Sequence, residues 1–428
     1  MSTFVLALFL AFFALQTTVE AGLVLLNIRH LRRLRAAGTE VPAPLRQHVD
    51  PEMARKSSDY TLANARFALV RDAYGAGLTL VILLSGVLPG AADYFSRHAL
   101  AGAHLFVVFL AGLSAVLSLA HLPFGLYHTF AIESHFGFNR TTWRLWLVDR
   151  VKGILLSAAI GAPLLYAVHG FMALTGRWWW LWLFAFLVAV QVAMLWAFPV
   201  LIAPLFNKFV PLPDGDLKQR LEALARDAGF RNRGLFVVDA SRRSRHSNAY
   251  FTGLFRPRIV LFDTLVDKMT TEEAAAVLAH EIGHYKAHHV HKRLALSLAG
   301  MLVGLFVLSK LVAWPPLFQA FGFTAPSFHA ALALFSLGGG AFTFFLEPVG
   351  AWLSRRDEYE ADRFSVRLAR QPEAMKSALI RMSGENLSNL NPHRWYSRWH
   401  YSHPTLLERM AAIDSLATAE TAQLLGNT

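Results

Sequence analysis

Seven long apolar stretches constrain this 428-residue chain more than any other feature. Each reaches the roughly 20 residues that a helix needs to cross the hydrocarbon core of a bilayer. They lie near 3–26, 73–92, 99–122, 153–174, 179–203, 293–313 and 328–350. A chain inside lipid must satisfy its own backbone hydrogen bonds, so these stretches are expected to be helices. The sequence therefore predicts a mainly α integral membrane protein with seven transmembrane helices.

The composition agrees with a membrane protein and indicates which partners to expect. Hydrophobic residues make up 54% of the chain and charged residues only 16%, too few for a water-soluble surface. The formal net charge is +12, but most basic residues flank the apolar stretches, and we find no aromatic–basic module for nucleic acid. We therefore expect a lipid bilayer and no nucleic acid as partner, and a monomeric chain. Because cysteine is absent, a metal would need histidine and carboxylate ligands.

The distribution of basic residues predicts an orientation. Arg and Lys are frequent in the loops after the first and third stretches and in the polar segments 204–292 and 351–428, whereas the intervening loops offer only Arg97 and Arg177. Basic loops stay in the cytoplasm, so the N-terminus is expected outside and both polar segments inside. The "RWWWLW" run at 177–182 is typical of an aromatic belt at the outer interface. A compact chain without an ER-retrieval signal at "LLGNT" suggests a bacterial inner membrane.

Four parts are expected along the chain. They are a five-span membrane region at 1–203, a cytoplasmic loop at 204–292, the sixth and seventh spans at 293–350, and a helical tail at 351–428. The tail begins with the helix-forming pattern "RRDEYEADRFSVRLAR".

The sequence pattern of the loop 204–292 predicts helices and a small sheet. An amphipathic helix at 216–228 ends at Gly229, a common helix terminator. "GLFVVDAS" predicts one strand, and "SNAYFTGLFRPRIVLFDTL" predicts two more around a turn that holds Arg256 and Pro257. A capping box, Thr270 followed by Glu273, starts the next helix.

That next helix carries "HEIGH", residues 280–284. One helical turn separates His280 from His284, so both imidazoles can reach one metal ion. Glu281, roughly 100° round the helix axis, lies beside them without ligating and is suited to act as a general base on a water. The chain holds 18 histidines, so five residues alone leave another interpretation open: an interfacial helix with polar residues.

A catalytic zinc needs a third protein ligand and an open position. "SRRDEYEAD" offers Glu358, Glu360 and Asp362. Glu358 and Asp362 share a helix face, which suits one ligand and one acceptor that orients a ligand histidine. The predicted topology places both motifs on the cytoplasmic side, although the same pattern is also typical of a solvated helix start.

The chain resembles the type I CAAX prenyl proteases, integral membrane zinc metalloproteases that cleave on the carboxyl side of prenylated cysteines. Six matches in order carry the resemblance over nearly the whole chain: "ESHFGFNRTT", "IAPLFNKFVPLP", "HSNAYFTG", "HEIGH", "SRRDEYEAD" and "YSHPTLLERM". It implies a barrel of seven helices around a water-filled chamber, closed on the cytoplasmic side by a zincin-like α+β catalytic portion. The ionisable residues Glu20 and His104, within the first and third stretches, are then expected to line the chamber.

The resemblance also implies roles for individual residues. His280, His284 and Glu358 would ligate one zinc ion per chain, Glu281 would be the base, and Asp362 would orient a ligand histidine. Two further roles follow: His403 would stabilise the oxyanion and Asn248 would hold the substrate backbone, in a strand edge to which an extended peptide adds. From the sequence alone, Asn248 is equally a turn residue before a strand, and His403 a residue at a helix start.

Several alternatives stay open at this point. The substrate can be a prenylated or an unmodified membrane-associated peptide. A quality-control protease of the HtpX type shares the zinc motif but has fewer spans, and a transporter, a receptor or a catalytically silent scaffold would make "HEIGH" incidental. His288, His289 and His291 continue the motif helix and are interpreted as a basic end facing the interface, with a second metal site as the alternative.

Overall fold

The structure is a computed structural model that describes residues 1–98, 100–230, 233–252 and 257–426. In these ranges seven helical stretches are long and apolar enough to cross a membrane, as predicted. Their main helices are α1 (Ser2–Ala36), α2 (Pro51–Leu84), α4 (Gly102–Tyr127), α5 (Trp143–Leu174), α6 (Trp179–Ala197), α11 (His289–Leu311) and, for the seventh, α13 (Phe328–Gly338), α14 (Gly340–Thr343) and α15 (Glu347–Ala369). The predicted mainly α membrane fold is confirmed.

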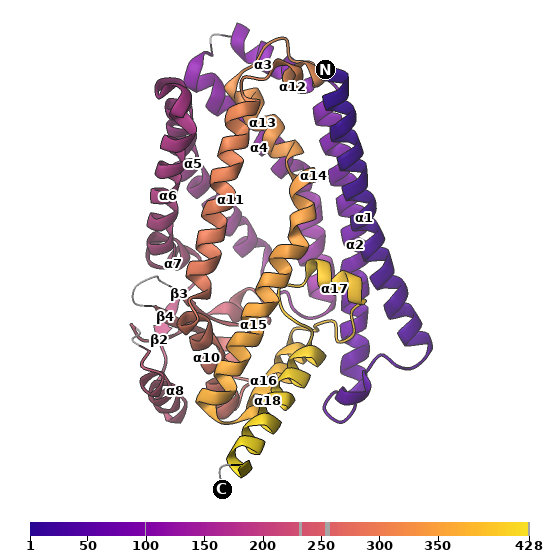
Figure 1. The fold of residues 1–428 in the computed structure, drawn as a ribbon, viewed down its shortest axis with the longest axis vertical. Helices are drawn as coiled ribbons and strands as arrows, with labels where there is room; N and C mark the ends of the chain where they lie inside the picture. Colours follow the sequence, from indigo (N-terminus) through magenta and orange to yellow (C-terminus); the bar gives the residue numbers. More distant parts are fainter. Residues whose placement is uncertain (99, 231–232, 253–256, 427–428) are drawn as a thin grey trace.

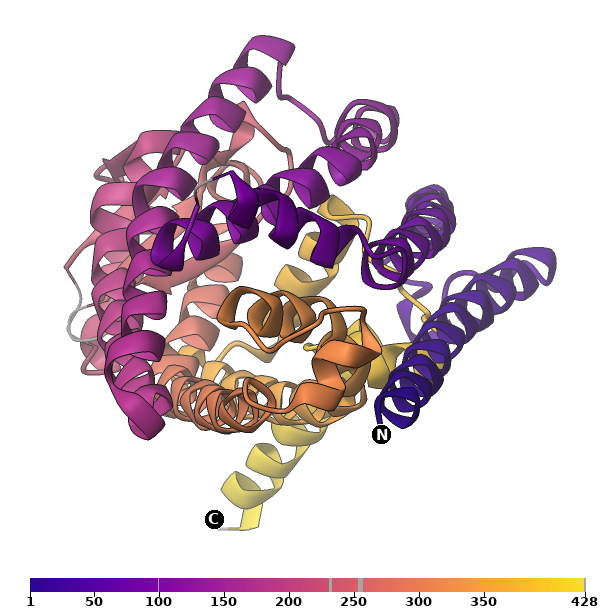
Figure 2. The same cartoon turned by 90° about the horizontal axis from the view of Figure 1, so that it is seen from above.

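The long helices stand around the long axis of the molecule (Figure 2). A cavity of ≈ 610 Å³ lies among them, bounded by side chains of α1, α2, α4 and the seventh stretch. Glu20 lines this cavity, as expected. His104 instead lies 2.8 Å from the Tyr166 hydroxyl and does not line it.

Several helices extend well beyond the apolar stretches that predicted them. α2 begins at Pro51, well before the predicted apolar stretch near 73–92. Asp50 caps this start, because its side chain accepts from the Glu52 amide at 3.1 Å. α15 runs from the seventh crossing through the whole "SRRDEYEAD" motif. The prediction that residues 355–370 begin the tail as a helix is confirmed in its helical character, but this helix starts at Glu347 and continues from the seventh crossing. Pro348 does not interrupt α15, because it lies in the first turn, where a missing amide proton costs nothing.

The seventh crossing is interrupted halfway. α13 ends at Gly338 and α14 begins at Gly340, so one residue, Gly339, separates the two helices. A Cβ at position 338 would lie 3.4 Å from the Phe9 ring, an ordinary van der Waals contact, so the crossing lies against α1 at this point.

The described part of the segment 204–292 contains a four-stranded sheet. The strands β1 (Phe209–Pro211), β2 (Leu235–Val238), β3 (Ala249–Thr252) and β4 (Arg258–Phe262) lie in the order β1-β2-β4-β3. β2 and β4 are parallel, and the outer two strands pair antiparallel with them. β1 has three residues and ends in proline, so its sequence carried no strand pattern. The predicted turn residue Arg256 lies outside the described residues, and Pro257 directly precedes β4.

Helices surround this sheet. α8 (Asp216–Asp227) ends as predicted, with Gly229 in the left-handed conformation at φ 58°. α10 (Thr271–Lys286) begins at the predicted capping box and packs on α8, α15 and α16 (Pro372–Glu385). α17 (Arg394–His400) and α18 (Leu406–Gly426) complete the tail.

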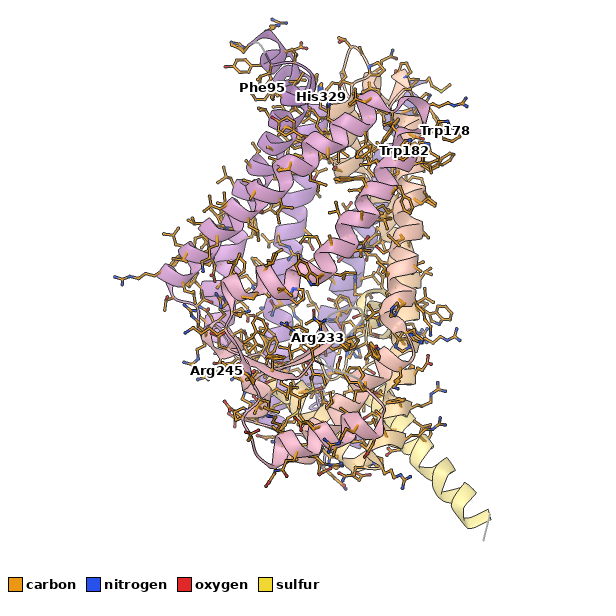
Figure 3. The ribbon with its side chains drawn as sticks, turned by 90° about the vertical axis from the view of Figure 1, so that its left-hand side faces the viewer. Phe95, Trp178, Trp182, Arg233, Arg245 and His329 are labelled. Carbon is orange, nitrogen blue, oxygen red and sulfur yellow. The ribbon has the colours of Figure 1, made fainter. Side chains whose placement is uncertain are left out.

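The two ends of the molecule differ in character. Figure 1 shows the N-terminus at one end of the long axis, and the sheet, α10 and the C-terminus at the other. Figure 3 shows Trp178 and Trp182 near the end that holds Phe95, whereas Arg233 and Arg245 lie toward the opposite end. This placement agrees with an aromatic belt at the membrane–water interface that lies farther from the sheet.

Candidate metal centre

Two helices from distant parts of the chain, α10 and α15, approach closely enough to build one site. Gly283 makes this approach possible, because a Cβ there would lie 3.0 Å from the Cα of Ala361 and 3.0 Å from the Cβ of Phe364. The hydroxyl of Ser365, which is fully buried, donates to the Ala276 carbonyl at 2.7 Å and fixes the two helices in register. The glycine inside "HEIGH" thus has a packing function.

Three side chains converge where these helices meet. His280 Nε2 and His284 Nε2 lie 3.1 Å apart, and each lies 3.3 Å from an oxygen of Glu358. Donors bound tetrahedrally at about 2.0–2.1 Å from one ion are separated by roughly 3.3 Å, the edge of that tetrahedron. Two imidazole nitrogens and a buried carboxylate directed at one point are a donor set that fits a divalent metal.

Glu281 lies beside this donor set on α10. It is half-buried, and across the described ranges its carboxylate forms no hydrogen bond or ion pair. Burial raises the pKa of Glu281 above its usual value. A carboxylate with a raised pKa and no fixed partner is able to accept a proton near neutral pH.

A carboxylate and a guanidinium hold the first ligand ring. His280 Nδ1 lies 2.8 Å from Asp362 Oδ1, and Asp362 accepts from Arg409 Nη2 at 2.5 Å and from Arg409 Nε at 2.9 Å. Burial favours the neutral ring, but the hydrogen bonds that the ring donates to Asp362 and Glu358 prevail and raise the pKa of His280 to about 9. The contact to Asp362 leaves Nε2 facing the donor set. Arg409 was not predicted, although it lies inside the "YSHPTLLERM" motif.

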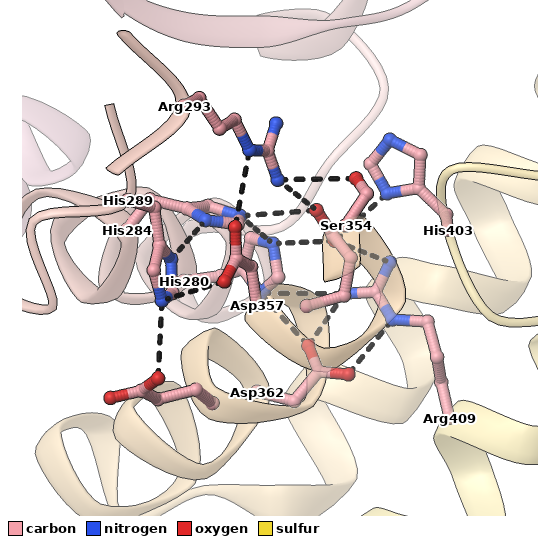
Figure 4. A network of polar contacts seen from close by, with 11 residues as sticks. His280, His284, His289, Arg293, Ser354, Asp357, Asp362, His403 and Arg409 are labelled. Carbon is pink, nitrogen blue, oxygen red and sulfur yellow. Dashed lines mark hydrogen bonds and ion pairs between the residues drawn. The ribbon is translucent and has the colours of Figure 1, made fainter. Parts of the chain in front are cut away.

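His289 holds the second ligand ring (Figure 4). Its Nδ1 lies 2.8 Å from His284 Nδ1, and its Nε2 lies 3.2 Å from Glu360. Only 1% of His289 is exposed, so its predicted place at a basic, interface-facing helix end is wrong. The left-handed conformation of His288, at φ 56°, turns the chain between α10 and α11 and directs His289 back to the site. Burial lowers the pKa of His284 and so favours the neutral, ligating ring.

His403 reaches the site from the segment between α17 and α18. Its Nδ1 lies 2.8 Å from Glu358 Oε2, while 62% of its side chain is exposed. Arg355 positions this segment, since its Nη1 donates to the carbonyls of Arg398 and Tyr401 at 3.2 and 2.7 Å. A groove of ≈ 470 Å³ runs past His403.

Asn248 stands apart from the donor set. It is exposed at the start of β3, and its side-chain oxygen accepts from the Ala249 amide at 2.8 Å. β3 is the edge strand of the sheet and contacts α10. The structure thus places Asn248 on a strand edge beside the ligand helix and not in contact with the ligands.

Comparison with known proteins extends to the whole chain. Residues 30–208 match the domain described as "CAAX prenyl protease N-terminal, five membrane helices", and residues 211–417 match "Peptidase family M48". The crystal structure of S. mikatae Ste24p is similar with a TM-score of 0.87 and 33% sequence identity, over 96% of this chain and 98% of that one.

Individual relatives agree with this family. CAAX prenyl protease 1 of Saccharomyces cerevisiae is 36% identical over 88% of this chain and 89% of its own length. The CAAX prenyl protease 1 homolog of Homo sapiens is 31% identical over 90% of this chain and 91% of its own length. The interpretations of "HEIGH" as incidental in a transporter or receptor are therefore not supported. This chain belongs to the CAAX prenyl protease 1 family of M48 peptidases and is an integral membrane metalloprotease.

Proposed function

We propose that this membrane metalloprotease binds one zinc ion through His280, His284 and Glu358 and hydrolyses peptide bonds with Glu281 as general base. The observation that carries the proposal is the convergence of two imidazole nitrogens 3.1 Å apart, each 3.3 Å from one oxygen of Glu358, with the carboxylate of Glu281 beside them. Nitrogen and oxygen donors of this kind, without cysteine, are the ligands of catalytic zinc sites.

Each neighbouring side chain has a part in the reaction. Zinc, when bound, supplies a Lewis acid that polarises the scissile carbonyl and lowers the pKa of water. Glu281 accepts the proton of the attacking water and delivers it to the leaving amine. His403, with Nδ1 2.8 Å from Glu358 Oε2, stabilises the oxyanion in its doubly protonated form, because a neutral ring that donates through Nδ1 has no second N–H to offer. Asp362 keeps the His280 ring in the ligating orientation.

The proposed substrate is an extended peptide from a membrane-associated protein, with a prenylated carboxyl-terminal peptide as the first candidate. The relatives' name, CAAX prenyl protease 1, supports the prenylated class. The edge strand β3 supplies main-chain hydrogen bonds, a mode of binding that demands little of the peptide sequence, and Asn248 at its start offers its side-chain amide to the substrate backbone.

We further propose that the N-terminus faces outward and the metal centre faces the cytoplasm of a bacterial inner membrane. The Arg- and Lys-rich loops all lie on the side of the metal centre, which supports this orientation.

The decisive experiment compares the wild type with Glu281→Gln in detergent, on a farnesylated peptide and its unmodified twin. The Gln variant keeps the ligands, so it should retain about one zinc per chain and lose cleavage by about 10²–10⁴-fold. Wild-type rates in the variant would refute the role of Glu281. Equal wild-type rates on both peptides would remove any specific role of the lipid.

A further inference from the structure

The edge strand β3 has one side that faces β4 and one that faces outward. Asn248 O accepts from the Phe262 amide at 3.0 Å, which makes 248 and 262 a hydrogen-bonded pair. In an antiparallel ladder such pairs alternate, so the backbone groups of 250 and 252 also face β4. The backbone groups of Ser247, Ala249 and Phe251 therefore point to the open edge, where a peptide would add.

One side chain already occupies the start of this open edge. The Ser247 amide donates to Asn386 Oδ1 at 3.0 Å, and Asn386 Nδ2 donates to the Ser247 carbonyl at 3.1 Å. A neighbouring strand would make this same pair of hydrogen bonds with an outward residue. Asn386 thus takes the place of one residue of an incoming strand and ends the edge at Ser247.

The end of α16 holds Asn386 rigidly. Asn386 caps the helix, and the next residue, Leu387, is buried with φ 47°, a left-handed conformation that is unfavourable for a non-glycine residue. The turn is closed by the Ser388 amide, which donates to the Ser383 carbonyl at 2.9 Å. A strained residue in a buried turn fixes the position of the amide beside it.

His246 also contacts Asn386, and Glu133 of the N-terminal half of the chain holds His246 in place. His246 Nδ1 lies 3.3 Å from Asn386 Oδ1, and its Nε2 lies 3.2 Å from Glu133. Asn139 and Ser244 form a β-bridge just before the edge strand. These residues explain the "ESHFGFNRTT" motif, to which the metal chemistry gives no role.

Beyond Asn386 the outer edge of β3 is unpaired. The Ala249 amide is covered by its neighbour Asn248, but in the described part of the chain nothing pairs with the Ala249 carbonyl or with the outward groups of Phe251. The groove of ≈ 470 Å³ is lined by Asn386, which contacts this edge, and by His403, which contacts the ligand Glu358. A peptide that passes Asn386 and adds to β3 can therefore pair with it only from Ala249 onward.

We propose that Asn386 is a positioning residue that sets the register of the substrate strand and so selects which peptide bond lies at the metal. The inference rests on the proposed function, in which the substrate backbone adds to β3. Strand pairing repeats every two residues, so a peptide that slips by one step along the edge presents a bond two residues away.

The test uses Asn386→Ala in the full-length, zinc-loaded enzyme and a farnesylated peptide that the wild type cleaves at one bond. We expect KM and kcat for the normal bond to fall together by several-fold, because the freed backbone groups of Ser247 let part of the peptide bind one step out of register. Mass spectrometry should also detect new products cut two residues from the normal site. Asn386→Asp, which keeps the acceptor for the Ser247 amide, should show a smaller fraction of these products.

Glu385→Gln is the matched control, because Glu385 adjoins Asn386 but pairs with Lys268 away from the groove. It should keep the normal product and KM. A single normal product from Asn386→Ala, with unchanged KM and melting temperature, would overturn the register role alone. Absence of any cleavage by the zinc-loaded wild type would overturn the proposed function and this inference together.

Discussion

The orientation of a ligand histidine depends on a residue from the following transmembrane helix. His289 contacts His284 through Nδ1 and is itself held by Glu360, so it fixes the ring that must present Nε2 to the metal. Such outer contacts raise the basicity of a ligand and reduce its freedom before binding.

Replacing His289 by alanine should therefore weaken zinc binding by about 10–100-fold, the usual effect of losing a residue that orients a ligand. The measurement is competition for zinc with a chelator of known affinity. His291→Ala, an exposed neighbour on the same helix, is the control and should bind zinc like the wild type. Equal affinity in the two variants would contradict the role of His289.

Glu273 connects the start of α10 to α16 by charge. Its buried carboxylate accepts from the Ser377 hydroxyl at 2.5 Å, the Thr270 amide at 2.9 Å and Arg381 Nε at 2.9 Å. Burial alone would raise the pKa of Glu273, but these bonds prevail and lower it below 4.5. The carboxylate is thus ionised in the folded state at pH values where it is protonated in the unfolded state.

This sign predicts how stability depends on pH. Where only the unfolded state binds the proton, stability rises with pH, so the contribution of Glu273 is complete above pH 4.5 and is lost as pH falls through the lower folded pKa. Melting curves in detergent between pH 7 and pH 3 should show Glu273→Gln less stable by about 1–3 kcal/mol at pH 7. The difference from wild type should shrink at acid pH. Parallel curves for the two proteins would contradict this account.

The sequence predicted the residues whose chemistry follows from local spacing. "HEIGH" places His280, Glu281 and His284 by helical periodicity alone, and the structure brings Glu358 to them. Arg409 escaped prediction because its contact with His280 joins residues 129 positions apart. Asn386 escaped for the same reason, since its partner Ser247 is 139 positions away. Pattern analysis finds neighbours on one helix but not contacts made by tertiary folding.

At the scale of elements, the contact between α10 and α15 decides whether the site exists. No side chain fits at Gly283 without moving backbone atoms of α15, because the nearest atoms lie at 3.0 Å. Helix α15 also carries the third ligand, so separation of the helices moves Glu358 away from the histidines.

Gly283→Ala should therefore destabilise the fold by about 1–3 kcal/mol, as overpacking does, and also lower zinc occupancy. Gly300→Ala is the control, because a Cβ at position 300 on α11 meets nothing within 4 Å. Zinc content per chain and the melting temperature are measured on both variants. A Gly283→Ala protein with full zinc and an unchanged melting temperature would show that the contact is not needed.

Helix types were predictable from the sequence, but their limits were not. Apolar length located every crossing, because lipid imposes that length directly. It could not show that α2 begins at Pro51 or that α15 continues to Ala369, since polar helical turns outside the lipid have no such requirement. β1 pairs with β2 and has three residues, which is too short for a periodic signal.

At the scale of the whole molecule, the proposed orientation has a direct test. The chain contains no cysteine, so single-cysteine variants report one position each. A membrane-impermeant maleimide should label Thr175→Cys in intact cells, because that loop lies at the end away from the metal centre. Thr418→Cys on α18 should be labelled only after the membrane is permeabilised. The reverse pattern would contradict the orientation.

The glycines at 338–340 divide the seventh crossing into an outer and an inner piece. The inner piece, from Gly340 to Glu358, is roughly 27 Å long at 1.5 Å per residue. In an unbroken rod, a change of tilt forced by thicker or thinner lipid would displace the ligand carboxylate by ångströms. Glycine lowers the cost of bending a helix, so we expect the outer piece to adjust to the lipid while the inner piece stays docked on α10. Peptide cleavage should then differ little between thin and thick bilayers.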